Sequence, residues 1–213
     1  YIWYISYIFR NHDVGIILCT SGRYVMRVIA KYVILLVLTV NLHSQTRHIV
    51  RIEKGLNLQS LELAKSQVGV KEVGNNGGKQ VTEYLQSVGL RAGNPWCMSF
   101  QYWCFYKTAK VNPIPRSGHC VTVFNGLRKK SIETKPATTI QVGDLLFWAN
   151  VQNFGHVARI TEVSAGGWVY TIEGNTSSGT KGSQDDGDGV SIRKRNYLHP
   201  LGSKRFLGLV GFY

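Results

Sequence analysis

Cys97 is the residue best placed to act as a nucleophile, because it follows Pro95-Trp96 and begins a predicted helix over residues 97–109. The unpaired backbone N–H groups and the positive dipole at a helix N-terminus stabilise a thiolate, which is the attacking form of cysteine. The same N–H groups can also bind the oxyanion of a tetrahedral intermediate. Cys104 lies two helical turns further on, where we expect it to pack in the core. These features predict nucleophilic catalysis by Cys97.

A cysteine nucleophile needs a base, and His156 is our candidate. It follows Gly155 at the start of a predicted strand, at a sheet edge where the N-terminus of a helix can dock. Glu173 ends the following predicted strand, and Asn175 lies two residues later on the same face of an extended chain. Two adjacent antiparallel strands would bring His156 and Glu173 to the same end of the sheet. Either Glu173 or Asn175 can orient the imidazole, and the sequence leaves that choice open.

Each of these residues also has a simpler interpretation. A cysteine on an apolar helix usually packs in the core, a histidine beside a glycine is usually structural, and Glu173 is explained equally well as a solvated strand end. The other histidines compete for the role of base: His12, His43, His48, His119 and His199.

No metal or organic cofactor is predicted. The chain has no C-x-x-C or H-x-x-x-H pairing of the kind that binds zinc. The segment DDGDG at 185–189 resembles part of a calcium-binding loop but lacks the rest of the ligand set, so we interpret it as a hairpin turn.

The elements that must position these residues change in character along the chain. Apolar residues recur at helical spacing in the first half, and period-two patterns rich in β-branched residues follow after Pro136. Helices followed by strands predict an α+β domain with an antiparallel sheet of about five strands. The predicted helices cover 58–68, 79–88, 97–109 and 121–128, and the predicted strands cover 144–149, 156–163, 168–173, 190–195 and 206–212.

The N-terminal segment does not resemble part of this domain. Residues 26–44 have the basic start, short apolar run and small residue near a cleavage point that are typical of a secretory signal peptide. We therefore predict an upstream extension at 1–25, a signal peptide at 26–44, a short linker at 45–57, and a catalytic domain at 58–213. This division predicts export to the periplasm or the extracellular space. A membrane anchor within residues 1–42 is the alternative, although charged residues interrupt it repeatedly.

The chain is strongly basic, with 25 Lys and Arg against 12 Asp and Glu and a net charge of +13. Removing residues 1–44 takes away four basic residues and one acidic residue, which leaves +10. Such a charge favours anionic partners, although it can also serve solubility alone. Three cysteines remain, and an odd number in an oxidising compartment suggests a free thiol.

Three longer stretches resemble the CHAP family, the cysteine, histidine-dependent amidohydrolases and peptidases. AKSQVGVKEVGNNGGKQVTEYLQSVGLRAGNPWCMSFQYW resembles the start of the domain, and GDLLFWANVQNFGHVARITEV resembles its central hairpin. YTIEGNT with DGDGVSIRKR resembles its third element. Together these stretches lie within residues 58–212. Met98 and Gln101 depart from the family pattern, in which smaller or aliphatic residues are commoner.

The resemblance implies a papain-like fold and hydrolysis of amide bonds in peptidoglycan, without a cofactor. It implies that Cys97 is the nucleophile, His156 the base and Glu173 the orienting residue, with Asn175 assisting the histidine or the oxyanion. Trp96 is expected either to line the cleft or to pack in the core.

The expected partner is peptidoglycan, with no nucleic acid, no stable membrane insertion after processing, and a monomeric state. Under this resemblance, Cys104 and Cys120 are candidates for a disulfide that leaves Cys97 free. A catalytically silent wall-binding or interaction module on the same fold is the alternative function.

Overall fold

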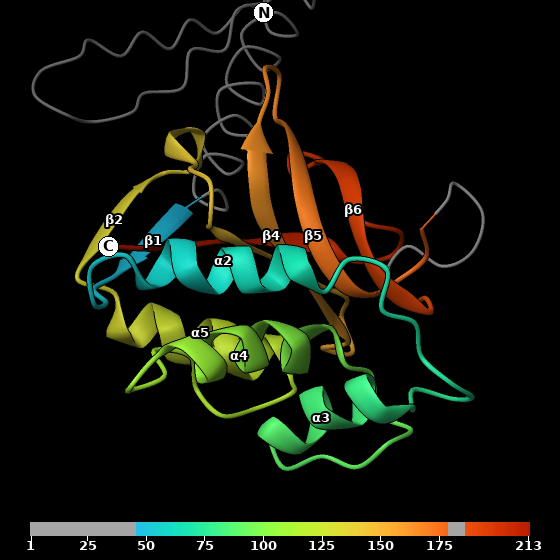
Figure 1. The fold of residues 1–213 in the computed structure, drawn as a ribbon. Helices are drawn as coiled ribbons and strands as arrows, with labels where there is room; N and C mark the ends of the chain where they lie inside the picture. The colour runs from blue at the N-terminus through green and yellow to red at the C-terminus, as the bar shows by residue number, and fades with distance from the viewer. Residues whose placement is uncertain (1–45, 179–185) are drawn as a thin grey trace, which may run out of the picture. The chain divides into compact units, whose positions relative to one another are not determined.

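The strands form one seven-stranded sheet in the order β2-β1-β7-β3-β4-β5-β6 (Figure 1). The computed structural model describes residues 46–178 and 186–213. Within these residues the sheet joins segments that are far apart in sequence. Its strands are β1 (Thr46–Val50), β2 (Glu133–Pro136), β3 (Leu145–Ala149), β4 (Gly155–Val163), β5 (Trp168–Thr176), β6 (Gly189–Asn196) and β7 (Arg205–Phe212).

Within residues 46–178, four α-helices precede most of these strands: α2 (Leu56–Ser66), α3 (Lys79–Ser87), α4 (Cys97–Thr108) and α5 (Cys120–Lys130). A short 3-10 helix, η1 (Ala137–Thr139), follows β2. Helix α4 is the centre of the helical layer, because it contacts α2 and α3 on one side and β4 and β5 on the other. Helix α5 packs on β3. The predicted α+β class is confirmed, and all four predicted helices are present with ends within two residues of those expected.

The predicted sheet is wrong in two respects. It has seven strands instead of about five, and it is mixed, because β1 pairs with β7 in parallel while the other pairs are antiparallel. The two unpredicted strands are the short β1 and β2, which pair with one another at one edge. Short edge strands carry little periodicity, and β2 is mostly exposed and ends in a proline, which edge strands tolerate.

Strand β1 lies in the segment predicted to be a linker, and a buried ion pair holds it there. The Arg47 guanidinium donates to Asp144 from Nε at 2.5 Å and from Nη2 at 2.9 Å, and both side chains are buried. Asp144 directly precedes β3. The pair therefore links the outer strands to the centre of the sheet.

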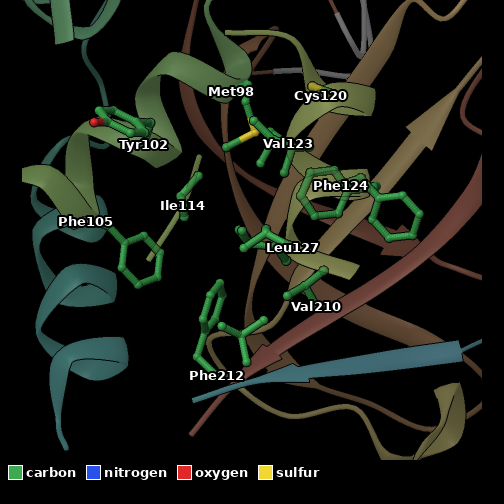
Figure 2. Close-up of a cluster of buried hydrophobic side chains, with 14 of the residues drawn as sticks. Met98, Tyr102, Phe105, Ile114, Cys120, Val123, Phe124, Leu127, Val210 and Phe212 are labelled. Atoms are coloured by element: carbon green, nitrogen blue, oxygen red, sulfur yellow. The ribbon is translucent and has the colours of Figure 1, made fainter. Parts of the chain in front are cut away.

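Apolar side chains from α4, α5 and β7 fill the space between the helices and the sheet (Figure 2). Met98 and Phe105 come from α4, Leu127 comes from α5, and Val210 and Phe212 come from β7. The cluster includes residues from the first turns of both helices, such as Met98 in α4 and Cys120 in α5, so both helices pack against one core.

Several predictions concern residues outside the described ranges. The upstream extension at 1–25 and the signal peptide at 26–44 lie entirely outside them, as does the part of the β5–β6 loop at 179–185. Among the described residues, no helix has the length and apolar character needed to cross a membrane. These same residues contain no cluster of three or more side chains suited to binding a metal ion.

Candidate active site

Cys97 is the first residue of α4, as the sequence predicted. Its side chain is 3% exposed and lines a cavity of about 470 Å³, together with Pro95, Cys120, Phe154 and Lys204. The backbone N–H groups of the first helical turn have no partners within the helix. A carbonyl compound that enters this cavity would meet both the thiol and those N–H groups.

His156 and Glu173 meet in the structure. His156 is the second residue of β4, Glu173 lies in β5, and the two strands are adjacent and antiparallel, as predicted. His156 Nε2 lies 2.9 Å from Glu173 Oε2, and neither side chain is exposed. Because Nε2 makes this contact, Nδ1 is the imidazole atom that can accept the proton of the Cys97 thiol. Nδ1 is buried and has no nitrogen or oxygen partner among the described residues.

Two further side chains hold the carboxylate of Glu173. Thr171 Oγ1 donates to Oε1 at 2.5 Å, and Arg195 donates to Oε1 from Nε at 2.8 Å and to Oε2 from Nη2 at 2.5 Å. Burial raises the pKa of Glu173, but the hydrogen bonds from Arg195 and His156 outweigh burial and lower it to about 2. Glu173 is therefore ionised at neutral pH, so it accepts a hydrogen bond from Nε2–H of His156.

The charges of Cys97 and His156 are coupled. A hydrogen bond with Cys120 lowers the pKa of Cys97 most, burial raises it, and the interaction with His156 lowers it further, with a net value well below the ordinary one. Burial lowers the pKa of His156, but the interactions with Cys97 and Glu173 outweigh burial and raise it to about 9. Both shifts favour a thiolate beside an imidazolium, which is the activated form of a cysteine nucleophile.

The sulfur atom beside Cys97 belongs to Cys120, the first residue of α5. The two Sγ atoms are 3.7 Å apart and both side chains are buried. The candidate disulfide between Cys104 and Cys120 is not present in the structure. The three cysteines of the described residues are free, and Cys104 lies in a different core cluster, two turns along α4. Burial raises the pKa of the Cys104 thiol to about 12, which makes it unreactive.

Asn175 and Trp96 lie near the site without entering it. Asn175 is buried and adopts a left-handed φ of 57°. Its Nδ2 donates to Asp186 Oδ1 at 3.1 Å. The residue that is hydrogen-bonded to His156 is Glu173. Trp96 is fully buried, donates to Glu72, and packs against Tyr84. The packing interpretation of Trp96 therefore accounts for its position, and Trp96 is not among the residues that line the cavity.

Three of the competing histidines are described, and none of them contacts Glu173. His119 lines the same cavity, but its Nδ1 caps α5 by accepting from the backbone N–H of Thr122. His48 lies in β1 with its ring against Phe124, and His199 lies beside a separate cavity near Trp168. His12 and His43 lie outside the described residues.

Sequence reasoning did not identify Thr171, Cys120 or Arg195 as parts of this site. Arg195 belongs to a basic triplet, and such a triplet is usually exposed to solvent. Side chains alternate between the two faces of a strand, however, so Lys194 is exposed and Arg195 is buried. Cys120 begins a helix just as Cys97 does, and that position is the signal that could have separated it from Cys104.

A comparison with protein families found a match for the segment that carries these residues. The family model described as "CHAP domain" matches residues 89–175, a range that contains Cys97, His156, Glu173 and Asn175. Neither the curated proteins nor the solved structures gave a match. The matched range is narrower than the 58–212 over which the motifs were compared, because it omits α2, α3 and the last two strands. The segment that carries the candidate site, residues 89–175, is thus the part of the chain that matches the CHAP domain family.

Proposed function

We propose that this protein is a cysteine amidohydrolase that cleaves amide bonds in peptidoglycan. The observation that carries the proposal is the buried hydrogen bond between His156 and Glu173, placed beside Cys97 at the wall of a cavity. A helix-borne thiol next to a strand-borne histidine is the arrangement expected of the papain-like fold that the CHAP resemblance implies. The match of residues 89–175 to the CHAP domain model supports cell-wall peptidoglycan as the substrate class.

In this mechanism the Cys97 thiolate attacks a peptide carbonyl carbon, and the first-turn N–H groups of α4 bind the oxyanion. The His156 imidazolium then donates its proton to the leaving amine, which departs and leaves a thioester on Cys97. The neutral imidazole next removes a proton from water, which hydrolyses the thioester. Glu173 keeps its charge throughout and holds the ring in place, a role that Arg195 and Thr171 support by fixing the carboxylate.

The bond cleaved is the amide between muramic acid and L-alanine or an amide within the stem peptide or cross-bridge. Mass spectrometry of digested peptidoglycan distinguishes the two, because an amidase releases a free lactyl carboxylate whereas an endopeptidase releases a new peptide terminus. The net charge of the chain favours adsorption to an anionic wall. Adsorption should therefore weaken as salt is raised, while cleavage of a short soluble peptide should not.

Substitution of Cys97 tests the enzyme proposal directly. We expect Cys97→Ala to abolish cleavage of purified cell walls, and we expect Cys104→Ala, a matched change seven residues along the same helix, to retain it. Circular dichroism confirms that both variants are folded. Wall clearance by Cys97→Ala equal to that of the parent would reject catalysis by Cys97, whereas binding of walls without cleavage by the parent would favour the alternative, a silent wall-binding module.

The proposal includes export and a monomeric state. We propose that residues 26–44 are removed during export to the periplasm or the extracellular space, and that the remaining domain acts without a partner subunit or a cofactor. N-terminal sequencing of secreted protein tests the processing, because a start at Tyr1 would contradict it. Size-exclusion chromatography with light scattering tests the monomer.

A further inference from the structure

Two thiols, rather than one, occupy the candidate active site. Cys97 and Cys120 are the first residues of α4 and α5, their Sγ atoms are 3.7 Å apart, and both line the same cavity. The proposed hydrolysis uses only one of them as a nucleophile. The second thiol therefore calls for a separate explanation.

The local packing brings Cys120 to this position. Gly155, the first residue of β4, leaves the space that Cys120 fills, because a Cβ atom on Gly155 would lie 2.5 Å from the Cβ atom of Cys120. The residue after Gly155 is His156, so Cys120 packs against the strand residue that precedes the base. The thiol pair and the base therefore form one packed unit.

The distance between the sulfur atoms permits a covalent bond after a small movement. A disulfide has an S–S length of about 2.05 Å, so the two sulfur atoms must approach by about 1.7 Å. Cys104 is excluded as a partner because two turns of α4 separate it from Cys97, a rise of about 10 Å. Among the described cysteines, Cys97 and Cys120 are the pair that can be joined without rearranging the fold.

We infer that Cys97 and Cys120 form a reversible disulfide when the protein meets a peroxide, and that this bond stores the nucleophile in a protected, inactive form. The inference concerns regulation of the site and rests on the proposed function only for the loss of activity. Formation of the bond is a property of the two thiols themselves.

The reaction balances with hydrogen peroxide as the oxidant. The Cys97 thiolate attacks one peroxide oxygen, the O–O bond breaks, and the products are a Cys97 sulfenic acid and, after proton transfer, water. The Cys120 sulfur then attacks the sulfenic sulfur, the S–O bond breaks, and a second water leaves. Two thiols have lost two electrons and two protons, and one peroxide has been reduced to two waters. A dithiol reductant reverses the change by thiol–disulfide exchange.

The electrostatics of the pair suit this order of events. The pKa of Cys97 is lowered and that of Cys120 is raised, chiefly because Cys120 donates its hydrogen bond to the Cys97 sulfur. Cys97 is therefore the thiolate that reacts first. Once Cys97 is oxidised, the negative charge of its thiolate no longer raises the pKa of Cys120. Burial still raises that pKa, and the nearby positive charge of Lys204 lowers it.

The test is peptide mapping of the full chain after treatment with hydrogen peroxide. Remaining thiols are blocked with an alkylating agent under denaturing, non-reducing conditions, and the digest is analysed by mass spectrometry. We expect a peptide pair linked through Cys97 and Cys120, with Cys104 alkylated, and we expect a dithiol to release the pair. The matched control Cys104→Ala should give the same linked peptides.

Two variants separate this result from general thiol damage. Cys120→Ala and Cys120→Ser should both form no link, and excess peroxide should drive their Cys97 to sulfinic and sulfonic acids, which a dithiol cannot reverse. The parent should regain most of its wall-cleaving activity after reduction. The activity that the two variants recover after the same reduction should be at least ten-fold lower than the activity that the parent recovers.

Recovery of Cys97 as a sulfinic acid in the treated parent, with Cys120 alkylated, would overturn the inference. So would a link that involves Cys104. Both outcomes, the oxidation state of Cys97 and the identity of the linked cysteines, are measured on the parent chain. They therefore test the inference even if the Cys120 variants fail to fold. If the link forms but the parent cleaves no cell wall, the proposed function fails and the thiol pair stands.

Discussion

His156 Nε2 lies 2.9 Å from Glu173 Oε2, and this pair is enclosed so completely that neither side chain has any exposed surface. A buried carboxylate next to an imidazole is costly unless both are held by further partners. Arg195 and Thr171 supply those partners for Glu173. The base of the candidate site is therefore oriented by a network that extends across three strands.

The pH dependence of activity should report the charge on His156. Its pKa is raised to about 9, so kcat/KM should fall as pH rises through about 9, where the imidazolium that protonates the leaving amine is lost. In Glu173→Gln, one of the two interactions that raise this pKa is weakened, so the alkaline limb should move towards the ordinary histidine value of about 6.5. The exposed Glu162→Gln on β4 is the control. An unchanged alkaline limb in Glu173→Gln would contradict the assigned role.

Loss of Arg195 should destabilise the fold and alter its response to acid. Arg195→Gln leaves a buried carboxylate without its cation, which should lower the free energy of unfolding at pH 7 by about 3–5 kcal/mol. In the parent, the lowered pKa of Glu173 contributes stability that is present above about pH 4.5 and is lost as pH falls towards about 2. The variant should lose stability at a higher pH.

Urea unfolding at a series of pH values measures both effects of Arg195→Gln. The exposed neighbour Lys194→Gln should change the free energy of unfolding by less than about 0.5 kcal/mol. Equal losses in the two variants would show that Arg195 does not act through Glu173.

A methyl group at Gly174 should push α4 away from the sheet. Its Cβ atom would lie 2.7 Å from Cζ3 of Trp96, the N-cap residue of α4, and 3.0 Å from Phe100, which lies within that helix. We expect Gly174→Ala to cost about 1–3 kcal/mol of unfolding free energy and to lower kcat more than KM. Trp96→Phe removes the Cζ3 atom, so the double variant should be more stable than the two single changes predict. Strict additivity would contradict this packing argument.

The pair of Arg47 and Asp144 should contribute to stability without contributing to chemistry. Arg47→Met leaves Asp144 buried and unpaired, and we expect a loss of about 3–5 kcal/mol in unfolding free energy. Replacing both residues, as in Arg47→Met with Asp144→Leu, should restore much of that loss. The exposed Arg51→Met is the control for charge. Thermal unfolding followed by circular dichroism measures all three.

Much of the fold could be predicted because its central elements have strong periodicity. The helix that begins at Cys97 and the strand that begins at Gly155 were both expected near their observed ends. Strands β1 and β2 could not be predicted, because β1 depends on a partner 162 residues away, as the pairing of Arg47 with Leu209 shows. A pairing of that kind leaves no local pattern.

The same limit applies to the site. Cys97 and His156 were identifiable because each lies at the start of an element and in a recognisable context, and Glu173 was identifiable from its context on the neighbouring strand. Arg195 and Cys120 were not, because their roles come from burial and from contacts between elements. The choice between Glu173 and Asn175 also depended on strand geometry, since both residues lie on one face of an ideal strand.

The position of β7 between β1 and β3 has a consequence for synthesis of the protein. A ribosome makes β1 first and β7 last, so the sheet remains split into two parts until residue 212 has been made. The helices α2 to α5 can form earlier, but the apolar surfaces that cover Val210 and Phe212 stay uncovered during that time. Folding of this domain should therefore be completed only after β7 has been made, and the unfinished domain should be a good client for chaperones that bind exposed apolar segments.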